Sequence, residues 1–338
     1  MTDKNHAIAL AAHPVGFPKD SDFQHLQLPK PTPGAGQFVV RTKFITVDPY
    51  MRGRMTGVRS YVDPFQIGQP IPGGAVGEVV ETNNADFPKG QAVLGMWGWQ
   101  DYHLSNGTDV QKLDPRLAPI STALGILGMP GMTAYFGFLN ICTPKAGETA
   151  YISGAAGAVG AIVGQIAKIK GLRAVGSAGS DEKVEYLINE CGYDAAFNYK
   201  HVPTKDWAAE IRKLCPKGVD CYFDNVGGDM TDAVFANLAP FARISICGVI
   251  SQYNLEKPEM GPRSTYMTLL VKQARAEGFI VSRFMQQWPE GIKQMATWIK
   301  EGKLKYKEDV LDGLENTPKA FMRMLKGENM GKQLVKVS

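Results

Sequence analysis

The spacing of apolar residues in the first third of the chain follows a strand pattern. β-Branched and aromatic residues mostly alternate with polar ones over Phe38–Val47, which predicts a strand. Gly74–Glu81 and Gln91–Met96 predict two further strands, and Asp86–Gly90 (DFPKG) has the composition of the turn between them. We therefore expect the N-terminal part of the chain to be rich in β-structure.

From Ser121 onwards, strand-like runs alternate with helical ones. The strands are predicted at Thr149–Ser153, Arg173–Gly176, Asp194–Asn198, Val219–Asp224, Arg243–Gly248 and Phe279–Val281. The helices between them are clearest at Gly157–Lys170, Asp181–Glu190 and Trp207–Leu214. This alternation is typical of a doubly wound parallel sheet with helices on both faces, so the predicted fold class is α/β.

An uncharged segment, Leu117–Pro144, lies where the two patterns meet. Its length alone would allow a membrane span. Because Pro119, Pro130 and Gly125 interrupt it, we expect instead a buried pair of helices that joins two domains.

The end of the chain predicts a helix near Pro289–Glu301, a second helix after Thr317-Pro318 and a final short strand at Gln333–Val337. We expect this strand to return to the N-terminal domain. The predicted domains are therefore 1–122 together with 293–338, and 123–292 between them.

The composition is that of a globular chain, with 44% hydrophobic and 21% charged residues, which excludes a wholly disordered, collagen-like or coiled-coil protein. The formal net charge of +4 is small for 338 residues, so we expect neither a nucleic-acid partner nor a membrane partner, although an anionic ligand would suit it. The five cysteines form no CxxC pair, and no signal peptide is evident. We expect no disulfide framework and a cytoplasmic location.

The strongest local motif is YISGAAGAVGAIVGQIAKIKG, over Tyr151–Gly171. A strand-like run ends at Ser153, glycines follow at positions 154, 157 and 160, and a helical run begins. Glycine lets the backbone approach a pyrophosphate closely, and the helix N-terminus offers free N–H groups to it. The motif predicts a nucleotide-binding loop, although glycines at this spacing also serve close helix–strand packing.

The end of the second strand indicates which dinucleotide is bound. NAD sites usually have an acidic residue there for the ribose hydroxyls, whereas Val175–Ala178 contains none and leaves room for a 2′-phosphate. Lys183 could supply positive charge, so the sequence favours NADPH. Asp181 and Glu182 are evidence against this, and we interpret them as first-turn acids of a helix capped by Ser180.

Eight segments then occur in a recognisable order. They are DPYMR (48–52), LGMPGMTAYFG (127–137), GAAGAVG (154–160), GSDEK (179–183), FNYK (197–200), FDNVGG (223–228), CGVISQYN (247–254) and GENMGKQLVK (327–336). Together they resemble the zinc-independent medium-chain dehydrogenase/reductase family, in the branch of prostaglandin reductase (leukotriene 12-hydroxydehydrogenase) and bacterial NADPH-dependent curcumin reductase. The resemblance covers nearly the whole chain. It implies a GroES-like β-rich catalytic domain built from both chain ends, a central Rossmann domain, a cleft between them, and a homodimer.

The resemblance also implies contacts to NADPH. The pyrophosphate would be bound by Gly157, Ala158, Val159 and Gly160, and the 2′-phosphate by Lys183 and Tyr199. The ribose, the nicotinamide half and their surroundings would be contacted by Asn225, Cys247, Gly248, Val249, Ile250, Ser251, Tyr253, Phe279, Ile280, Val281 and Asn329. The residues alone would equally allow Tyr199 to be a surface aromatic and Asn225 a turn residue.

The sequence offers no metal site and no nucleophile. The five histidines are scattered, and no cysteine occurs before residue 120, so the ligand set of a zinc site is missing. Where zinc-containing relatives have a ligand cysteine, this chain has Asp48-Pro49-Tyr50. Ser153 is not in a GxSxG motif, and we interpret Cys247 as a small core residue. No metal and no covalent catalysis are expected.

The implied chemistry is reduction of a carbon–carbon double bond conjugated to a ketone or aldehyde, with hydride passing from the nicotinamide to the β-carbon. Charge develops on the carbonyl oxygen, so a hydrogen-bond donor and a proton source are needed. Tyr253 and Tyr50 are the candidates, and for each a packing role remains open. Substrate contacts are predicted at Tyr50, Arg52, Met129 and Tyr253; the competing interpretation of Arg52 and Arg54 is surface salt pairing.

Two alternatives remain. A quinone reductase of the same superfamily would give one-electron products or leave double bonds intact. A non-catalytic NADPH-binding sensor would keep the glycine loop and Lys183 without needing Tyr50 or Tyr253.

Overall fold

The computed structural model describes residues 4–257 and 264–338. They form two compact units, of which unit 1 takes in Met1–Gly125 and Glu308–Ser338 and unit 2 takes in Ile126–Lys307. The chain thus returns to unit 1 at 307/308, whereas the sequence suggested a boundary at 292/293. Each unit has its own sheet and its own core.

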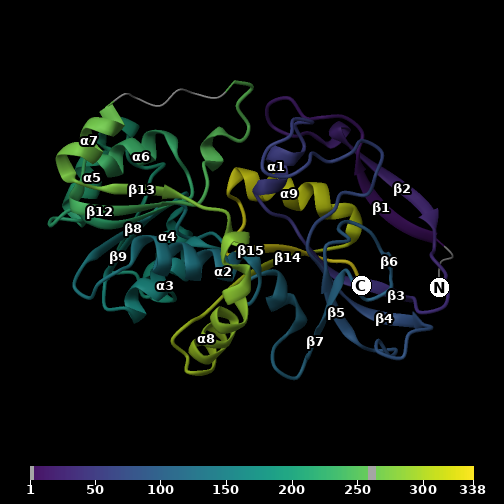
Figure 1. The fold of residues 1–338 in the computed structure, drawn as a ribbon. Helices are drawn as coiled ribbons and strands as arrows, with labels where there is room; N and C mark the ends of the chain where they lie inside the picture. Colours follow the sequence, from purple (N-terminus) through teal and green to yellow (C-terminus); the bar gives the residue numbers. More distant parts are fainter. Residues whose placement is uncertain (1–3, 258–263) are drawn as a thin grey trace. The chain divides into compact units, whose positions relative to one another are not determined.

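Unit 2 is built on a six-stranded parallel sheet (Figure 1). In spatial order the strands are β10 (Ala195–Asn198), β9 (Arg173–Ala178), β8 (Thr149–Ile152), β11 (Val219–Asp224), β12 (Leu238–Ile246) and β13 (Arg275–Gly278). The strands β8, β9 and β10 lie side by side in this order toward one edge of the sheet. The next strand, β11, lies on the other side of β8, so the strand order reverses there. In such sheets dinucleotides bind at the carboxyl ends of the strands, where the order reverses. The predicted doubly wound sheet is confirmed.

The helices of unit 2 cover both faces of this sheet. Figure 1 shows α5, α6 and α7 along one face and α3 and α4 along the other. Their bounds, in chain order, are α2 (Met129–Phe136), α3 (Gly160–Ile169), α4 (Asp181–Asn189), α5 (Trp207–Leu214), α6 (Gly228–Phe235), α7 (Ser264–Lys272) and α8 (Trp288–Lys300). Short 3₁₀ turns lie at Thr204–Asp206, Ile250–Gln252 and Val281–Gln287.

Two sequence predictions for this region are corrected. The last strand is not Phe279–Val281 but the preceding Arg275–Gly278, which forms hydrogen bonds to β12 at the sheet edge and is too polar to be recognised from its pattern. The uncharged segment does not form a pair of helices. It forms a 3₁₀ turn at Ile120–Leu124, then α2, which continues as a π-helical turn at Gly137–Cys142. Gly125 and Gly128 stand between the two parts, where glycine disfavours a continuous helix.

Unit 1 is rich in β-structure, as predicted. β1 (Lys4–Leu10) and β2 (Phe23–Pro29) form an antiparallel hairpin around a 3₁₀ turn at Asp20–Asp22. The larger sheet contains, in spatial order, β14 (Glu308–Asp312), β15 (Lys332–Lys336), β3 (Phe38–Thr46), β4 (Ala75–Thr82), β5 (Ala92–Gly95) and β7 (Val110–Leu113), with β6 (Tyr102–Ser105) also paired to β3. The C-terminal strand β15 therefore returns to the N-terminal domain, as expected.

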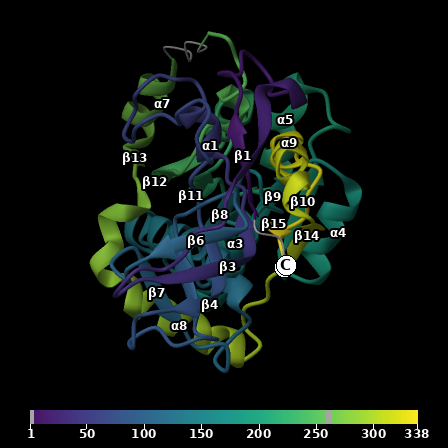
Figure 2. The ribbon, with the colours of Figure 1, turned by 90° about the vertical axis from the view of Figure 1, so that its right-hand side faces the viewer.

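Two helices and a 3₁₀ turn complete unit 1. α1 (Tyr50–Arg54) directly follows β3, and α9 (Thr317–Lys326) follows a 3₁₀ turn at Leu314–Asn316. Figure 2 shows α9 beside β14 and β15. The ring of Phe321 on α9 lies edge-on to the fully buried Trp99, with centroids 6.1 Å apart, so the C-terminal segment contributes to the core of the N-terminal strands. Within the described ranges, no helix has the length and apolar character needed to span a bilayer.

Candidate active site

The glycine loop between β8 and α3 is shaped by close backbone contacts. Gly154 has φ 58°, which favours glycine. A β-carbon on Gly160 would lie 2.5 Å from the Gly154 carbonyl oxygen and 2.8 Å from the Ala155 α-carbon. Gly160 is therefore required by the close packing of the loop itself. A packing role and a binding role are compatible at this residue.

The start of α3 leaves donors available. The N-cap residue, Val159, makes no side-chain capping hydrogen bond, and helical bonding begins with the Ala161 N–H, which donates to Gly157. Among the described residues, the backbone N–H groups of Ala158, Val159 and Gly160 have no acceptor. Such N–H groups and the helix dipole suit a pyrophosphate. The residues present therefore fit a dinucleotide at this loop.

A buried carboxylate, Asp224, organises the neighbouring strand end. Its Oδ1 accepts hydrogen bonds from the Ser153 hydroxyl at 3.1 Å and from the N–H groups of Val226 and Gly227 at 2.9 Å each. Its Oδ2 accepts a 2.5 Å hydrogen bond from the Thr231 hydroxyl. Four donors thus compensate the desolvation of the carboxylate without a cation. The same network fixes the turn that follows β11 next to the glycine loop.

Asn225 belongs to this network. Its side-chain Nδ2 donates to the Ser153 carbonyl oxygen at 2.7 Å, and its own N–H donates to the Ser153 hydroxyl at 3.0 Å. Asn225 is therefore more than a turn residue, since it ties the end of β11 to the end of β8. Its predicted cofactor contact would come from an already fixed amide.

The segment that follows β12 lies along the Asp224 turn. The N–H groups of Cys247 and Gly248 both donate to the Asp224 carbonyl oxygen, at 2.9 and 3.0 Å. Further along, Ile250 and Ser251 donate to the carbonyl oxygens of 225 and 226, at 3.3 and 3.1 Å. The Ser251 hydroxyl adds a 2.6 Å bond to the Val226 carbonyl. The predicted cofactor residues 225 and 247–251 therefore form one connected surface.

Tyr253 folds back over this segment. Its hydroxyl accepts a hydrogen bond from the Val249 N–H at 3.4 Å, and a β-carbon on Gly248 would lie 3.2 Å from it. The phenol is half-buried and lies next to the predicted cofactor surface of the same unit. This position suits a hydroxyl that acts close to a bound cofactor.

Cys247 is not a nucleophile in this environment. Burial, with a smaller contribution from the negative charge of Asp224, raises the pKa of its thiol to about 12. The thiol therefore stays protonated at physiological pH and is a poor attacking group. Cys247 is partly exposed, unlike the other four cysteines, so its interpretation as a small core residue stays a prediction.

Phe279 and its neighbours lie just after the edge strand. A β-carbon on Gly137 would meet the Phe279 ring at 2.3 Å, and this ring also lies edge-on to Phe223 with centroids 6.4 Å apart. The Phe279 side chain is thus used in packing, while Ile280 is 45% exposed.

The acids after β9 lie in the first turn of a helix capped by Ser180, as interpreted from the sequence. The Ser180 hydroxyl accepts a hydrogen bond from the Lys183 N–H at 3.3 Å, and Asp181 and Glu182 occupy the first turn of α4. The Tyr199 phenol lies near the preceding turn, since a β-carbon on Gly179 would be 2.9 Å from its hydroxyl. Lys183 and Tyr199 are therefore both placed at the end of β9.

In unit 1, Tyr50 opens α1 next to a buried ion pair. The Lys332 ammonium lies 2.9 Å from Asp48 Oδ1 and donates to the Val47 carbonyl oxygen at 2.9 Å. Thr46 donates to the other carboxylate oxygen at 2.9 Å. Burial and the Asp48 charge raise the pKa of Tyr50 well above its usual range. The phenol therefore remains a proton donor over the whole physiological range.

The guanidinium groups of the two arginines of α1 bind backbone carbonyl oxygens. Arg52 is buried, and its guanidinium donates to the carbonyl oxygens of Pro14 and Gly16 at 3.2 and 2.7 Å. Arg54 donates to the Asp63 carbonyl oxygen at 2.9 Å. The guanidinium groups hold loops in place, a role that planar, multidentate donors perform well.

The remaining predicted residues have local partners. The Asn329 amide in unit 1 donates to the Gly331 carbonyl oxygen at 2.9 Å. Met129 begins α2 in unit 2, and its carbonyl oxygen accepts a 2.8 Å bond from the Thr133 hydroxyl. The cofactor contact of Asn329 and the substrate contact of Met129 stay predictions.

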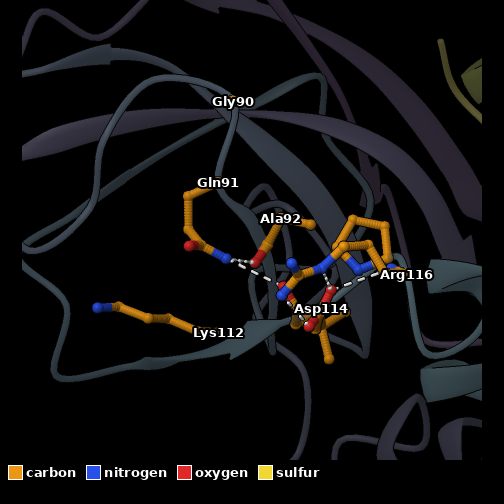
Figure 3. Close-up of a pocket in the computed structure, with 8 residues that line it drawn as sticks. Gly90, Gln91, Ala92, Lys112, Asp114 and Arg116 are labelled. Atoms are coloured by element: carbon orange, nitrogen blue, oxygen red, sulfur yellow. Dashed lines mark hydrogen bonds and ion pairs between the residues drawn. The ribbon is translucent and has the colours of Figure 1, made fainter.

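The described ranges hold no metal cluster, and a depression in unit 1 lies away from the predicted site residues. No group of three or more His, Cys, Asp or Glu side chains there could hold a metal ion. This shallow depression of about 360 Å³ lies between the segments 90–92 and 112–116. Figure 3 shows the side chains that line it. Arg116 is neutralised there by Asp114, with hydrogen bonds of 2.9 and 2.7 Å, and none of the predicted site residues lines it.

A doubly wound sheet with a donor-rich glycine loop, joined to a β-rich unit, defines a two-domain oxidoreductase that uses a dinucleotide. Residues 6–113 match the family model described as the N-terminal domain of oxidoreductase, and residues 158–297 match that of zinc-binding dehydrogenase. The NADPH-dependent curcumin reductase of Escherichia coli is 43% identical, covering 99% of this chain and 97% of the relative. The NADP(+)-dependent 2-alkenal reductase of Nicotiana tabacum is 44% identical, with 99% and 98% covered.

A solved structure agrees with these relatives. The crystal structure of CurA from Vibrio vulnificus in complex with NADPH has a TM-score of 0.93 and 41% sequence identity, with 98% of this chain and 99% of that chain covered. The chain therefore belongs to the zinc-independent branch of the medium-chain dehydrogenase/reductase family.

Proposed function

We propose that this chain is an NADPH-dependent reductase of the carbon–carbon double bond in α,β-unsaturated ketones and aldehydes. The observation that most directly supports cofactor use is the start of α3, where the unpaired N–H groups of Ala158, Val159 and Gly160 follow a parallel strand at the point of reversal. The reaction class is supported by relatives named for curcumin and 2-alkenal reduction.

The cofactor residues are proposed as follows. The loop 157–160 binds the pyrophosphate, Lys183 and Tyr199 bind the 2′-phosphate, and Asn225 with 247–251, Tyr253, 279–281 and Asn329 surround the rest. When bound, NADPH supplies the hydride that reaches the β-carbon. The hydrogen-bonded connection between the turn at Asp224 and the 247–251 segment gives this surface the rigidity that a fixed transfer geometry needs.

Two phenols are proposed to meet the carbonyl end of the substrate. As the double bond accepts the hydride, negative charge moves to the carbonyl oxygen, and a neutral phenol stabilises it by donating a hydrogen bond. Tyr50 suits this role because its raised pKa keeps it protonated. Tyr253 is the second candidate, placed beside the cofactor surface. One of them, or a water beside it, then supplies the proton to the α-carbon.

Substrate contacts are proposed at Tyr50, Met129 and Tyr253. Arg52 was also predicted as a substrate contact, but its guanidinium is already engaged by Pro14 and Gly16. We propose that it acts on the substrate through the position of that loop. The substrate is a small hydrophobic enone or enal.

A homodimer through the edge of the unit 2 sheet is also proposed. β13 forms the edge of the sheet, and α7, which contacts β12, exposes Tyr266, Leu270 and Val271 by 82%, 71% and 68%. Apolar exposure of this kind marks a protein interface. Leu270→Glu should produce monomers in light scattering, whereas the matched Val15→Glu, at a 77% exposed position in unit 1, should not. A wild-type chain that is monomeric at micromolar concentration would contradict the proposal.

A cytoplasmic location is proposed as well. The cysteines at 142, 191, 215, 221 and 247 are free thiols, which suits a reducing compartment.

The test of the function is NADPH oxidation with a panel of enones, enals and quinones, followed by product analysis. We expect NADPH to be preferred over NADH, a saturated ketone or aldehyde as product, and no effect of a chelator. If quinones are reduced while the double bonds of the enones are left unreduced, the chain is a quinone reductase instead. A sensor would be favoured by two results together. The wild-type chain would bind NADPH tightly but reduce no member of the panel, and a Tyr50→Phe/Tyr253→Phe variant would bind NADPH as tightly as the wild-type chain.

A further inference from the structure

The carboxyl ends of β9 and β10 meet in one corner of unit 2. Asn198, the last residue of β10, is the register partner of Ala178, the last residue of β9. The Tyr199 N–H then donates to the Ala178 carbonyl oxygen at 3.1 Å. The turn Gly179–Ser180 and the segment Tyr199–His201 are therefore held against each other.

Two side chains that directly follow β10 converge over Gly179. A β-carbon built there would lie 2.9 Å from the Tyr199 hydroxyl and 3.5 Å from Lys200 Cε. The Lys200 side chain is exposed, and no carboxylate in residues 4–257 or 264–338 pairs with it. An exposed ammonium thus lies beside the turn where the second ribose of a dinucleotide is expected.

The acid nearest to this turn is held by other groups. Asp181 Oδ1 accepts a 2.9 Å hydrogen bond from Nδ2 of the buried Asn198, and His201 Nδ1 lies 3.3 Å from the same oxygen. The Asn198 Oδ1 in turn accepts from the Lys200 N–H at 3.1 Å. One asparagine therefore fixes both the Asp181 carboxylate and the backbone that presents Lys200.

These contacts bear on cofactor choice. A carboxylate at the end of the second strand binds ribose hydroxyls and repels a 2′-phosphate, which favours NAD. Here the carboxylate is bound to the β10 side, while a cation and a phenol lie over the turn. The turn after β9 thus presents a cation and a hydroxyl donor, as a phosphate site does, although α4 begins with two acidic residues.

We propose that Lys200 is a second cationic contact for the 2′-phosphate of NADPH, and that Asn198 is a positioning residue that keeps Asp181 away from that phosphate. This inference rests on the proposed function, because it assumes that NADPH binds at the end of β9. It adds residues to the pair Lys183 and Tyr199 and explains why Asp181 is tolerated there.

The first experiment measures the dissociation constants of NADPH and NADH by fluorescence titration, without substrate. Lys200→Ala should weaken NADPH about tenfold and leave NADH unchanged, as expected for the loss of one charge-assisted contact. The matched control is Lys205→Ala, an exposed lysine of the following 3₁₀ turn, which should change neither constant. Equal weakening of both cofactors, or no change for NADPH, would overturn the role of Lys200.

The second experiment separates positioning from folding. Asn198→Ala releases Asp181, so NADPH should bind more weakly while NADH binds at least as well as before. Adding Asp181→Asn to this variant removes the released charge and should restore NADPH affinity, which a merely structural defect would not allow. If Asn198→Ala does not fold, Asn198→Ser, which keeps a small polar side chain, takes its place. Failure of Asp181→Asn to rescue a folded variant would overturn the positioning role.

Failure of the proposed function gives a different result. A folded wild-type chain that does not distinguish NADPH from NADH overturns both proposals. A wild-type chain that prefers NADPH and keeps this preference in Lys200→Ala overturns the Lys200 inference alone.

Discussion

The Tyr193 hydroxyl donates a 2.7 Å hydrogen bond to the Gly160 carbonyl oxygen, and its ring occupies the space beside Gly164. A β-carbon on Gly164 would lie 2.0 Å from that ring. Tyr193 stands just before β10, so this contact anchors the first turn of α3 to the neighbouring strand. Gly164, one turn beyond the phosphate loop, therefore makes room for the Tyr193 ring. The packed ring in turn holds the phosphate loop in position.

We predict that Gly164→Ala destabilises the protein by about 1–3 kcal/mol, because the overpacked ring must move. Tyr193→Phe should cost about 0.5–1.5 kcal/mol, because it removes one of the hydrogen bonds to the Gly160 carbonyl oxygen. Both variants should also weaken NADPH and NADH alike, since they disturb the pyrophosphate loop. Urea unfolding and cofactor titration check this.

The control for these variants is Gly53→Ala in α1. No atom lies within 4 Å of a β-carbon there, so the substitution should be neutral or slightly stabilising. Unchanged stability of Gly164→Ala would mean that the ring is free to shift.

The buried pair of Lys332 and Asp48 should behave as a coupled unit. Both side chains are only 6% exposed, so Lys332→Met or Asp48→Asn alone leaves an uncompensated group and should cost about 3–5 kcal/mol. The double variant should cost less than the sum of the two, which a double-mutant cycle in urea measures. Additive single effects would show that the two charges do not depend on each other.

Tyr50 gives a prediction about pH. An acid whose pKa is raised keeps its proton to higher pH, so the donor form of Tyr50 persists throughout the neutral and mildly alkaline range. The kcat for an enone should therefore show no alkaline loss from this group up to about pH 9. Tyr50→Phe should lower kcat by about a hundredfold at every pH in this range.

The matched control is Tyr135→Phe, which alters a tyrosine that packs on Phe136 and Trp298. This variant should retain its kcat. A Tyr50→Phe enzyme with wild-type kcat would remove Tyr50 from the proton-donor role and leave Tyr253.

Cys247 should react slowly with alkylating reagents. Its thiol has a pKa of about 12, so only ~10⁻⁴ of it is thiolate at pH 8. Even allowing for the higher nucleophilicity of a basic thiolate, iodoacetamide should label it about a hundredfold more slowly than a small thiol. The labelling rate, followed by mass spectrometry, should rise about tenfold for each pH unit between 7 and 10. A rate that levels off below about pH 9 would contradict the burial of this thiol.

The elements that the sequence predicted well are those with a strong local pattern. β11 and α5 were predicted with the bounds that the structure shows, since a continuous apolar run and an amphipathic run define them. The edge strand β13 was missed because Arg275–Gly278 is polar and faces outward. Its identity as a strand depends on pairing with β12, which is a long-range contact.

The residues of the candidate site divide in the same way, into those with a local sequence pattern and those that depend on long-range contacts. The glycine loop and the capping role of Ser180 could be predicted, because both depend on residues close together in the sequence. Asp224 carried a weak signal, an acid at a strand end before Gly227-Gly228. Lys332 carried none, since its partner Asp48 is 284 positions away. Arg52 was misjudged because charge alone suggests exposure, whereas three-dimensional packing surrounds it with carbonyl oxygens.

The construction of unit 1 from both chain ends has a consequence for biosynthesis. β15 lies between β14 and β3, so the sheet lacks an interior strand until Lys332–Lys336 have left the ribosome. Unit 2 is continuous in sequence and can fold while translation proceeds. During that interval residues Phe44–Thr46 of β3 lack the strand partner that β15 supplies. A truncated transcript or a ribosome stalled before residue 332 would therefore release a chain with a complete nucleotide-binding half and an open, aggregation-prone sheet.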